Sequence, residues 1–163
     1  MNRIRLPQLL DELRPEVTEV MPWDIAELHE KHPDLLIVDI RESYEFEAMR
    51  LAGSISIPRG ILELACEWDY EETEPELAEA RDRPVLLVCR SGNRTVFAAY
   101  NLQRMGFHHV YSLSTGLKGW NDFELPLVDK EGHEVDVEMA DEYFEPLVRP
   151  DQIDPARRDS TGS

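Results

Sequence analysis

Short apolar runs alternate with helical segments along most of this chain, and that order constrains its fold more than any other feature. Residues 34–40 read DLLIVDI and residues 85–88 read VLLV, both of strand length. Continuous apolar runs of this kind are typical of strands buried on both faces of a parallel sheet. Because strands alternate with helices, we predict an α/β fold with right-handed crossovers and helices on both faces of a mainly parallel sheet.

Three shorter strands complete a predicted five-stranded sheet, at residues 17–21, 53–58 and 109–113. Helices are predicted at residues 22–32, 43–49 and 94–105, with a turn and a short helix at 115–123. Two further short helices are predicted between 60 and 82, with a break near EETEP. Ser43 is a suitable N-cap for the helix at 43–49. Gly106 is a suitable stop for the helix at 94–105.

Length and composition indicate one globular domain with an extension at each end. The 163 residues are enough to bury a core without disulfides or a metal. We divide the chain into an N-terminal arm (1–16), a domain (17–126) and an acidic C-terminal extension (127–163). The extension has weak periodicity and is rich in proline near its end, so we expect irregular packing there and disorder in the last dozen residues.

The charge of the chain excludes several classes of partner. With 34 acidic and 17 basic residues, the formal net charge is -17. Such a chain repels phosphates, so we expect no binding to nucleic acid or to anionic membranes. The basic start of the chain lacks the apolar run of a secretory signal, and no stretch reaches membrane-spanning length. We therefore expect a cytoplasmic protein with reduced thiols.

A cysteine stands at the end of the most apolar strand. Cys89 directly follows residues 85–88, and in parallel sheets functional sites lie at the carboxyl ends of the strands. Gly92 and Asn93 tolerate unusual backbone angles, so the loop can curl until successive N–H groups point inward as an anion nest. The helix that begins near Arg94 adds unpaired N–H groups and a positive dipole end. These surroundings favour the thiolate form of a cysteine.

The other polar side chains of this loop suit an anionic substrate. Arg90 and Arg94 add positive charge, which predicts a basic funnel on an otherwise acidic surface. The hydroxyl group of Ser91 or Thr95 is placed to donate to the sulfur of Cys89. A buried structural cysteine would explain none of these neighbouring residues.

The segment VLLVCRSGNRTVFAAYNLQRMGFHHVYSLSTGLKGW (85–120) closely resembles the second half of a single-domain rhodanese, a sulfurtransferase. The segment VDIRESYEFEAMRLAGSISIP (38–58) resembles the first half more loosely, and the likeness covers about residues 17–126. It implies a rhodanese-like fold, with Cys89 as the catalytic nucleophile and residues 90–94 as the substrate loop.

Further details of the resemblance concern residues around this loop. Asp39 and Arg41 match the Asp-x-Arg pair of the family, which implies structural support below the site. Met49 and Arg50 stand where the family often has Gly-His, so the packing there and the rim of the pocket should differ.

The resemblance also implies a reaction. The thiolate attacks the outer sulfur of thiosulfate or a similar donor, sulfite leaves, and a persulfide remains on Cys89. A thiol, a cysteine of a carrier protein or cyanide then accepts the sulfur, which gives two-step nucleophilic catalysis with ping-pong kinetics. No cofactor is implied.

Two other functions stay open. One is a rhodanese-like sulfur-relay or protein-binding module with little turnover on free donors. The other is a cysteine-dependent phosphatase or arsenate reductase, but related phosphatases have five residues between cysteine and arginine, whereas four separate Cys89 from Arg94. Arginine directly after the cysteine also resembles thiosulfate-type enzymes more than those that use mercaptopyruvate.

Some remaining residues have both a structural and a functional interpretation. Cys66 lies in a predicted amphipathic helix, where core packing competes with a role as resolving thiol. The pair His108–His109 lacks a full set of ligands, so no metal site is predicted. Trp120 either packs against the sheet or lines the pocket. The acidic extension is either solvated or docks a sulfur-carrier protein.

Overall fold

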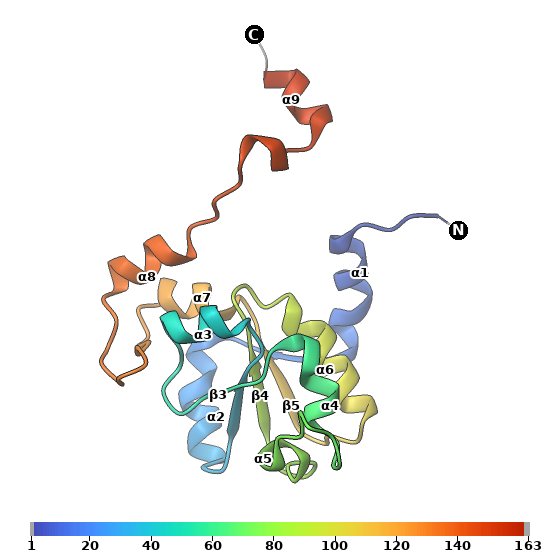
Figure 1. Cartoon of the computed structure of the whole chain (residues 1–163), viewed down its shortest axis with the longest axis vertical. Coiled ribbons are helices and arrows are strands. Elements are labelled where there is room, and N and C mark those ends of the chain that lie inside the picture. The colour runs from blue at the N-terminus through green and yellow to red at the C-terminus, as the bar shows by residue number, and fades with distance from the viewer. Residues whose placement is uncertain (1, 162–163) are drawn as a thin grey trace.

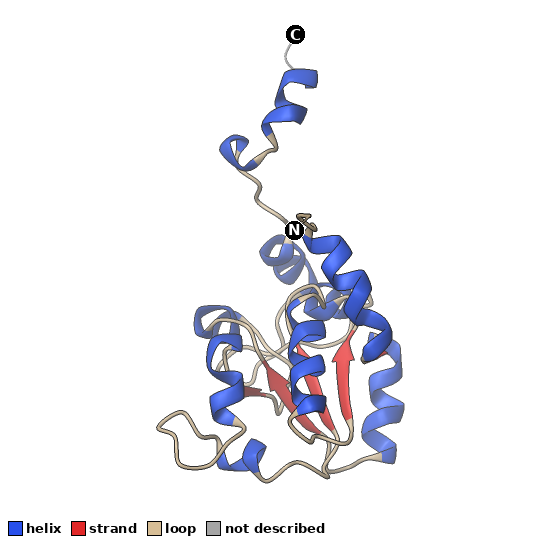
Figure 2. Ribbon diagram, turned by 90° about the vertical axis from the view of Figure 1, so that its right-hand side faces the viewer, coloured by secondary structure: helices blue, strands red, loops and turns tan. Residues whose placement is uncertain are grey.

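The computed structural model of the chain describes residues 2–161, with side chains through residue 158. Within these residues a sheet of five strands runs in the order β1-β5-β4-β2-β3, and every neighbouring pair is parallel. Helices cover both of its faces (Figures 1 and 2), which confirms the predicted α/β architecture. The strands are β1 (Thr18–Val20), β2 (Leu36–Asp39), β3 (Ile55–Ser56), β4 (Val85–Val88) and β5 (Val110–Leu113).

The helices follow the predicted order along the domain. They are α1 (Leu6–Leu13), α2 (Ile25–Lys31), α3 (Ser43–Ala48), α4 (Leu62–Ala65), α5 (Pro75–Ala78), α6 (Arg94–Arg104), α7 (Gly116–Asp122), α8 (Val137–Phe144) and α9 (Pro155–Thr161). Short 3₁₀ turns lie at Arg14–Glu16, Pro22–Asp24, Arg59–Ile61 and Pro150–Gln152. Gly106 follows α6 with a φ of +92°, a conformation that suits the predicted stop.

The predicted N-cap of α3 is wrong by one residue. The helix begins at Ser43 itself, and Glu42 occupies the capping position. The Glu42 amide donates to the Glu45 carboxylate at 2.9 Å. This reciprocal arrangement, in which a glutamate three residues on satisfies the free amide, makes a serine cap unnecessary.

The central position of β4 in the sheet explains why its sequence is apolar throughout. Successive side chains of a strand point to opposite faces of the sheet. Val85 and Leu87 join a core cluster with α4 and α6, whereas Leu86 and Val88 join a second cluster with α2, α7 and α8. All four are fully buried, so the strand is covered on both sides, as the sequence predicted.

The C-terminal extension contains an ordered helix that the sequence pattern did not predict. Phe144 and Ala140 of α8 are buried in the second core cluster. Asp136 caps the helix by accepting from the Glu138 amide at 2.8 Å. The expectation of irregular packing failed here because α8 buries a narrow apolar stripe on an otherwise acidic helix, which lies beside α7 (Figure 1).

The last part of the chain lies away from the domain. Figure 1 shows α9 at the far end of the C-terminal segment. The predicted disorder of the last dozen residues falls partly on residues 162–163, which lie outside the described residues, and residues 155–161 form α9. The division of the chain at residues 16 and 126 stays a prediction. Within residues 2–161, no helix is both long enough and apolar enough to cross a membrane.

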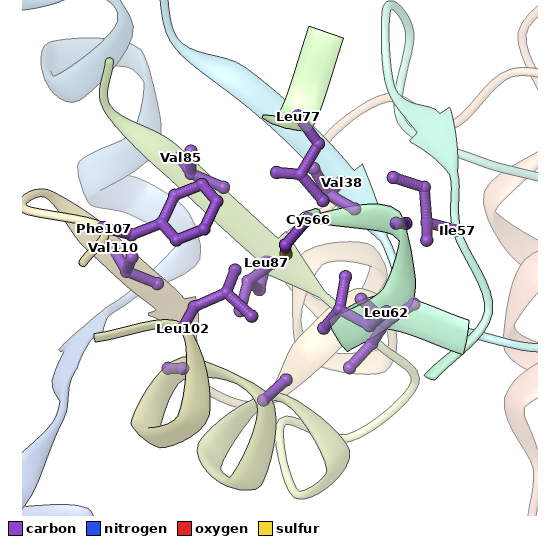
Figure 3. Close-up of a cluster of buried hydrophobic side chains, with 14 of the residues drawn as sticks. Val38, Ile57, Leu62, Cys66, Leu77, Val85, Leu87, Leu102, Phe107 and Val110 are labelled. Atoms are coloured by element: carbon purple, nitrogen blue, oxygen red, sulfur yellow. The ribbon is translucent and has the colours of Figure 1, made fainter. Parts of the chain in front are cut away.

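Cys66 belongs to the core. It directly follows α4 and lies among apolar side chains that include Leu62, Leu77 and Leu87 (Figure 3). Burial raises the pKa of the Cys66 thiol to about 12. A protonated, enclosed thiol is a poor nucleophile, so the structure favours the packing interpretation of this residue over the resolving thiol.

We therefore predict that Cys66 resists alkylation in the folded protein. In the Cys89→Ser variant, where Cys66 is the only cysteine of the chain, iodoacetamide at about pH 8 should label this thiol at least about 100-fold faster in denaturant than in its absence. Mass spectrometry of timed samples measures both rates. Equal labelling rates would show that Cys66 is accessible in the folded protein, and a role as resolving thiol would again be open.

Candidate functional site

The candidate site lies at the carboxyl end of β4. Cys89 is fully buried directly after this strand, and residues 90–93 lead into α6, which begins at Arg94. The strand–loop–helix order places the sulfur beside the first turn of α6. This is the edge of the sheet at which the sequence predicted a site.

The first turn of α7 holds the backbone of the loop. The Leu117 amide donates to the Cys89 carbonyl at 2.9 Å, and the Lys118 amide donates to the Arg90 carbonyl at 3.0 Å. Gly116 has a φ of +62°, and a Cβ atom there would overlap the Arg90 carbonyl group. Only glycine allows this close approach, so α7 fixes the direction in which the loop leaves the strand.

Within residues 2–161, the sulfur of Cys89 has one main-chain amide and one hydroxyl group within hydrogen-bonding distance. The Gly92 amide donates to Sγ at 3.2 Å, and Thr95 Oγ1 lies 3.6 Å from Sγ. Gly92 has a φ of +83°, and a Cβ atom there would press on the backbone of Thr115. The left-handed turn at Gly92 is therefore what directs an N–H group at the sulfur.

Sequence reasoning expected a fuller ring of amides than the structure contains. Among the described residues, the Gly92 amide is the main-chain group that donates to Sγ. Asn93 does not take a left-handed conformation; it lies in the right-handed helical region and leads directly into α6. Its side-chain oxygen instead accepts from Arg14 Nη2 at 3.2 Å, which ties the N-terminal arm to the loop.

A hydroxyl pair behind the sulfur includes a residue that the sequence analysis missed. Ser112 on β5 is fully buried, and its hydroxyl donates to Thr95 Oγ1 at 2.7 Å. Thr95 is fully buried beside Sγ, whereas Ser91 is exposed, so Thr95 is the hydroxyl that the structure brings to the sulfur. A polar residue facing the core from a short strand was the available signal for Ser112.

Both arginines of the loop are engaged within the protein. Arg94 donates to the Glu45 carboxylate through Nη1 at 2.9 Å and through Nη2 at 3.1 Å. Arg90 Nη2 donates to the Phe144 carbonyl of α8 at 2.6 Å. The sequence predicted that these guanidinium groups would face an anionic substrate, and it had no means of locating Glu45 and Phe144 beside them.

A pocket of about 490 Å³ lies beside the loop, where Arg90 and Arg94 line it and the fully buried Cys89 does not. Two guanidinium groups and three carboxylates of the described residues contribute to its wall, so the predicted basic funnel is wrong for this structure. The reason is that α3 and the C-terminal extension bring acidic side chains to the rim. The lining residues are Glu42, Tyr44, Glu45, Arg90, Arg94, Tyr143, Glu145 and Leu147.

Glu45 is held as a carboxylate. Burial alone would raise its pKa, but hydrogen bonds from the Arg94 side chain and the Glu42 amide, together with the charge of Arg94, lower it on balance. A lowered folded-state pKa adds stability above the ordinary value of 4.5, and that stability is lost as the pH falls through the folded-state value. At neutral pH the Glu45–Arg94 pair is therefore a fixed part of the pocket wall.

Asp39 and Arg41 form a buried ion pair at the end of β2. Arg41 Nη2 lies 2.8 Å from Asp39 Oδ2 and also donates to the Met49 carbonyl at 2.6 Å. Both side chains are fully buried, and Arg41 Nη1 has no hydrogen-bond partner among the described residues. The pair thus fixes the turn that precedes α3, which carries Glu45.

Residues at two other positions contact segments outside the loop. Arg50 stacks on the Phe46 ring at 4.0 Å, and its backbone pairs with Val128, which ties this position to the C-terminal extension. Trp120 packs against the second core cluster and donates to the Pro126 carbonyl at 3.0 Å. It lines a separate groove beside α2 rather than the pocket lined by Arg90 and Arg94.

Among the side chains that the structure describes, one surface group has the atoms to hold a metal ion. The ligand atoms of Asp129, Glu131 and His133 lie within 4.8 Å of one another. The Asp129 carboxylate accepts hydrogen bonds from the backbone amides of Glu131 and His133. These bonds stabilise a turn, which explains why the three residues lie close together. We assign this group no role in the site.

The buried ion pair yields a stability prediction. Asp39→Asn should lower the free energy of unfolding by about 3–5 kcal/mol, because it leaves the buried Arg41 charge without its counterion. Urea denaturation measures this change. Asp122→Asn is the matched control, because it removes an exposed pair with Lys118 and should change stability by less than about 0.5 kcal/mol. Equal effects of the two substitutions would contradict the structural role of Asp39.

Two sulfurtransferases are similar to this chain in sequence. Thiosulfate sulfurtransferase GlpE of Glaesserella parasuis is 28% identical over 119 residues, which are 72% of this chain and 96% of that protein. Adenylyltransferase and sulfurtransferase MOCS3 of Oryza sativa is 29% identical over 66% of this chain, but the match spans only 25% of that larger protein.

A solved structure resembles the fold. It is a Rhodopseudomonas palustris protein of unknown function, described as a possible tyrosine phosphatase. The two chains superpose with a TM-score of 0.68 and 29% identity, over 77% of this chain and 96% of the other. The family model of the rhodanese-like domain matches residues 23–123, so this chain belongs to the rhodanese-like domain family.

Proposed function

We propose that this protein is a sulfurtransferase that moves a sulfane sulfur from thiosulfate or a similar donor to a thiol or cyanide acceptor. Cys89 carries the sulfur as a persulfide. The observation that supports this most strongly is the Gly92 N–H group, which donates to Sγ at 3.2 Å within a loop fixed by α7. A donor placed there favours a sulfur atom that bears negative charge.

The proposed reaction needs no oxidant or reductant. The Cys89 thiolate attacks the outer sulfur of thiosulfate, a new S–S bond forms, and the bond between the two thiosulfate sulfurs breaks. Sulfite leaves with the electron pair of that bond, and the persulfide on Cys89 keeps the negative charge of the thiolate. An acceptor thiolate or cyanide then attacks the outer sulfur and releases the Cys89 thiolate.

Thr95 and Ser112 form a relay that orients a hydroxyl toward this charge. The neutral Cys89 thiol donates to Thr95 Oγ1. Once Cys89 is a thiolate, the Ser112 hydroxyl still donates to Thr95 Oγ1, and the Thr95 proton is free to point at Sγ. The fully buried position of both residues makes this donation stronger than it would be in water. In this proposal the Gly92 amide and the Thr95 hydroxyl hold the thiolate and then the persulfide.

The proposal includes the partners and the place of the reaction. The donor is a small sulfur compound, the acceptor is a low-molecular-weight thiol or a thiol of a sulfur-carrier protein, and the reaction takes place in the cytoplasm. Cys66 takes no part, because it lies in the core with a raised pKa. The chemistry uses the loop at 89–95, with Asp39 and Arg41 as structural support.

Substitution of Cys89 tests whether this residue is the nucleophile. Cys89→Ser should abolish thiosulfate-dependent turnover with cyanide, and it should also abolish the mass gain of about 32 Da, one sulfur atom, after exposure to thiosulfate. Cys66→Ala is the matched control and should keep most of the turnover and the mass gain. Sulfur uptake by the Cys89→Ser variant equal to that of the wild type would sink the proposal.

Steady-state kinetics separate the alternatives. A relay module would take up sulfur on Cys89 but would turn over slowly with every small acceptor. Hydrolysis of an aryl phosphate that is lost in Cys89→Ser would favour a phosphatase. The four-residue spacing between Cys89 and Arg94 supports sulfur transfer over that reaction.

Substitution of Thr95 tests the relay formed by the Thr95 and Ser112 hydroxyl groups. Thr95→Val keeps the volume but removes the donor, so the rate of persulfide formation should fall by about 10- to 100-fold. Stopped-flow detection of sulfite release measures this rate. Thr18→Val on the exposed face of β1 is the control and should leave it unchanged. An unaltered rate in Thr95→Val would show that the hydroxyl has no part in holding the charge.

A further inference from the structure

The C-terminal extension forms part of the wall of the pocket beside the Cys89 loop. Tyr143, Glu145 and Leu147 line the same pocket as Arg90 and Arg94 of the loop. These three residues lie beyond residues 23–123, the part that matches the family model. Whatever they contribute to the site is therefore a feature of this chain and not of the matched domain.

The extension is anchored firmly enough to act as a wall. Phe144 is buried in the second core cluster. The buried Asn121 of α7 donates to Asp141 at 2.6 Å and to the Val137 carbonyl at 3.3 Å. Because α8 is fixed at both its start and its end, the residues that follow Phe144 emerge at a defined place over the loop.

These contacts engage both loop arginines: a carboxylate balances the charge of Arg94, whereas Arg90 keeps its charge but binds a backbone carbonyl. The Phe144 carbonyl accepts from Arg90 at 2.6 Å, and Arg94 is paired with Glu45. Glu42 and Glu145 add two further carboxylates to the lining. A dianion such as thiosulfate therefore meets guanidinium groups that are already bound and a wall with more negative than positive groups, which disfavours its entry.

The same wall offers apolar surface at its rim. Leu147, Tyr44 and Tyr143 are 87%, 72% and 37% exposed, although they are large, and all three line this pocket. Exposed apolar groups that gather at the mouth of a site indicate contact with a carbon-bearing ligand. Thiosulfate has no carbon atom to place against them.

We propose that the segment Tyr143–Leu147 is the specificity element of the sulfur site and selects organic persulfides, R–S–SH, over thiosulfate. The inference rests on the proposed sulfur transfer. The Cys89 thiolate attacks the terminal sulfur of R–S–SH, the new S–S bond forms, and the bond between the two donor sulfurs breaks. The thiolate R–S⁻ leaves with the electron pair, and the terminal proton stays on the transferred sulfur.

The experiment compares two donors in full-length protein. One is thiosulfate, and the other is the persulfide of N-acetylcysteine methyl ester, generated in situ, which carries a carbon group and no charged group besides its sulfur. For each variant, kcat/KM with each donor is divided by the wild-type value, so the different intrinsic reactivities of the donors cancel.

Leu147→Ser removes apolar surface at an exposed position and should not disturb folding. It should lower kcat/KM for the organic persulfide by about fivefold and leave the value for thiosulfate within about twofold. Val148→Ser is the matched control: Val148 is the next residue, is also exposed, and does not line the pocket. It should change neither value.

A second pair of variants tests the charge of the wall. Glu145→Gln should raise kcat/KM for thiosulfate by about two- to threefold and leave the organic persulfide unchanged, since only the dianion is strongly repelled. Glu138→Gln, on the exposed first turn of α8, is the control and should affect neither donor. These exposed substitutions avoid the unfolding that a change at Phe144 would risk.

The outcomes separate this inference from the proposed function. If Cys89 gains sulfur from both donors but Leu147→Ser behaves like Val148→Ser, or lowers both donors equally, the specificity role is overturned while the sulfur transfer stands. If Glu145→Gln leaves kcat/KM for thiosulfate unchanged, the claim that the acidic wall repels thiosulfate is overturned. If Cys89 gains sulfur from neither donor, the proposed function falls, and this inference falls with it.

Discussion

The hydrogen bond from the Gly92 amide to the sulfur of Cys89 is the interaction on which the site depends. It exists because Gly92 adopts a left-handed conformation, which turns one N–H group back toward the end of β4. The first turn of α7 holds the carbonyls of Cys89 and Arg90 from the other side. The chemistry of the loop is thus set by backbone geometry, and the two glycines, Gly92 and Gly116, are what permit it.

The surroundings of this loop differ from a simple anion-binding cradle. Glu45 and the Phe144 carbonyl occupy the two guanidinium groups that follow the cysteine. The acidic composition of the chain is therefore more than a solvated surface, because some of its carboxylates reach the rim of the pocket.

The sequence was sufficient for the sheet and for the position of Cys89 at the carboxyl end of β4. The apolar run at 85–88 and the alternation of strands and helices determine the layers, and the position of Cys89 after a buried strand determines the edge. Contacts that depend on distant parts of the chain were not predictable. The pairing of Arg94 with Glu45, the Thr95–Ser112 relay and the Phe144 contact each join residues far apart in sequence. The helix α8 was not predicted because its sequence has few apolar residues among many acidic ones. Those few residues are enough to dock the helix, since they face a core that the rest of the domain already forms.

Proton NMR of the Gly92 amide tests the central claim most directly. A hydrogen bond to a charged sulfur should shift this amide resonance downfield, slow its exchange with solvent, and move it again when Cys89 takes up sulfur. If the Gly92 amide exchanges as fast as an exposed loop amide, and its resonance does not respond to sulfur on Cys89, the N–H group does not hold the sulfur and the account is contradicted.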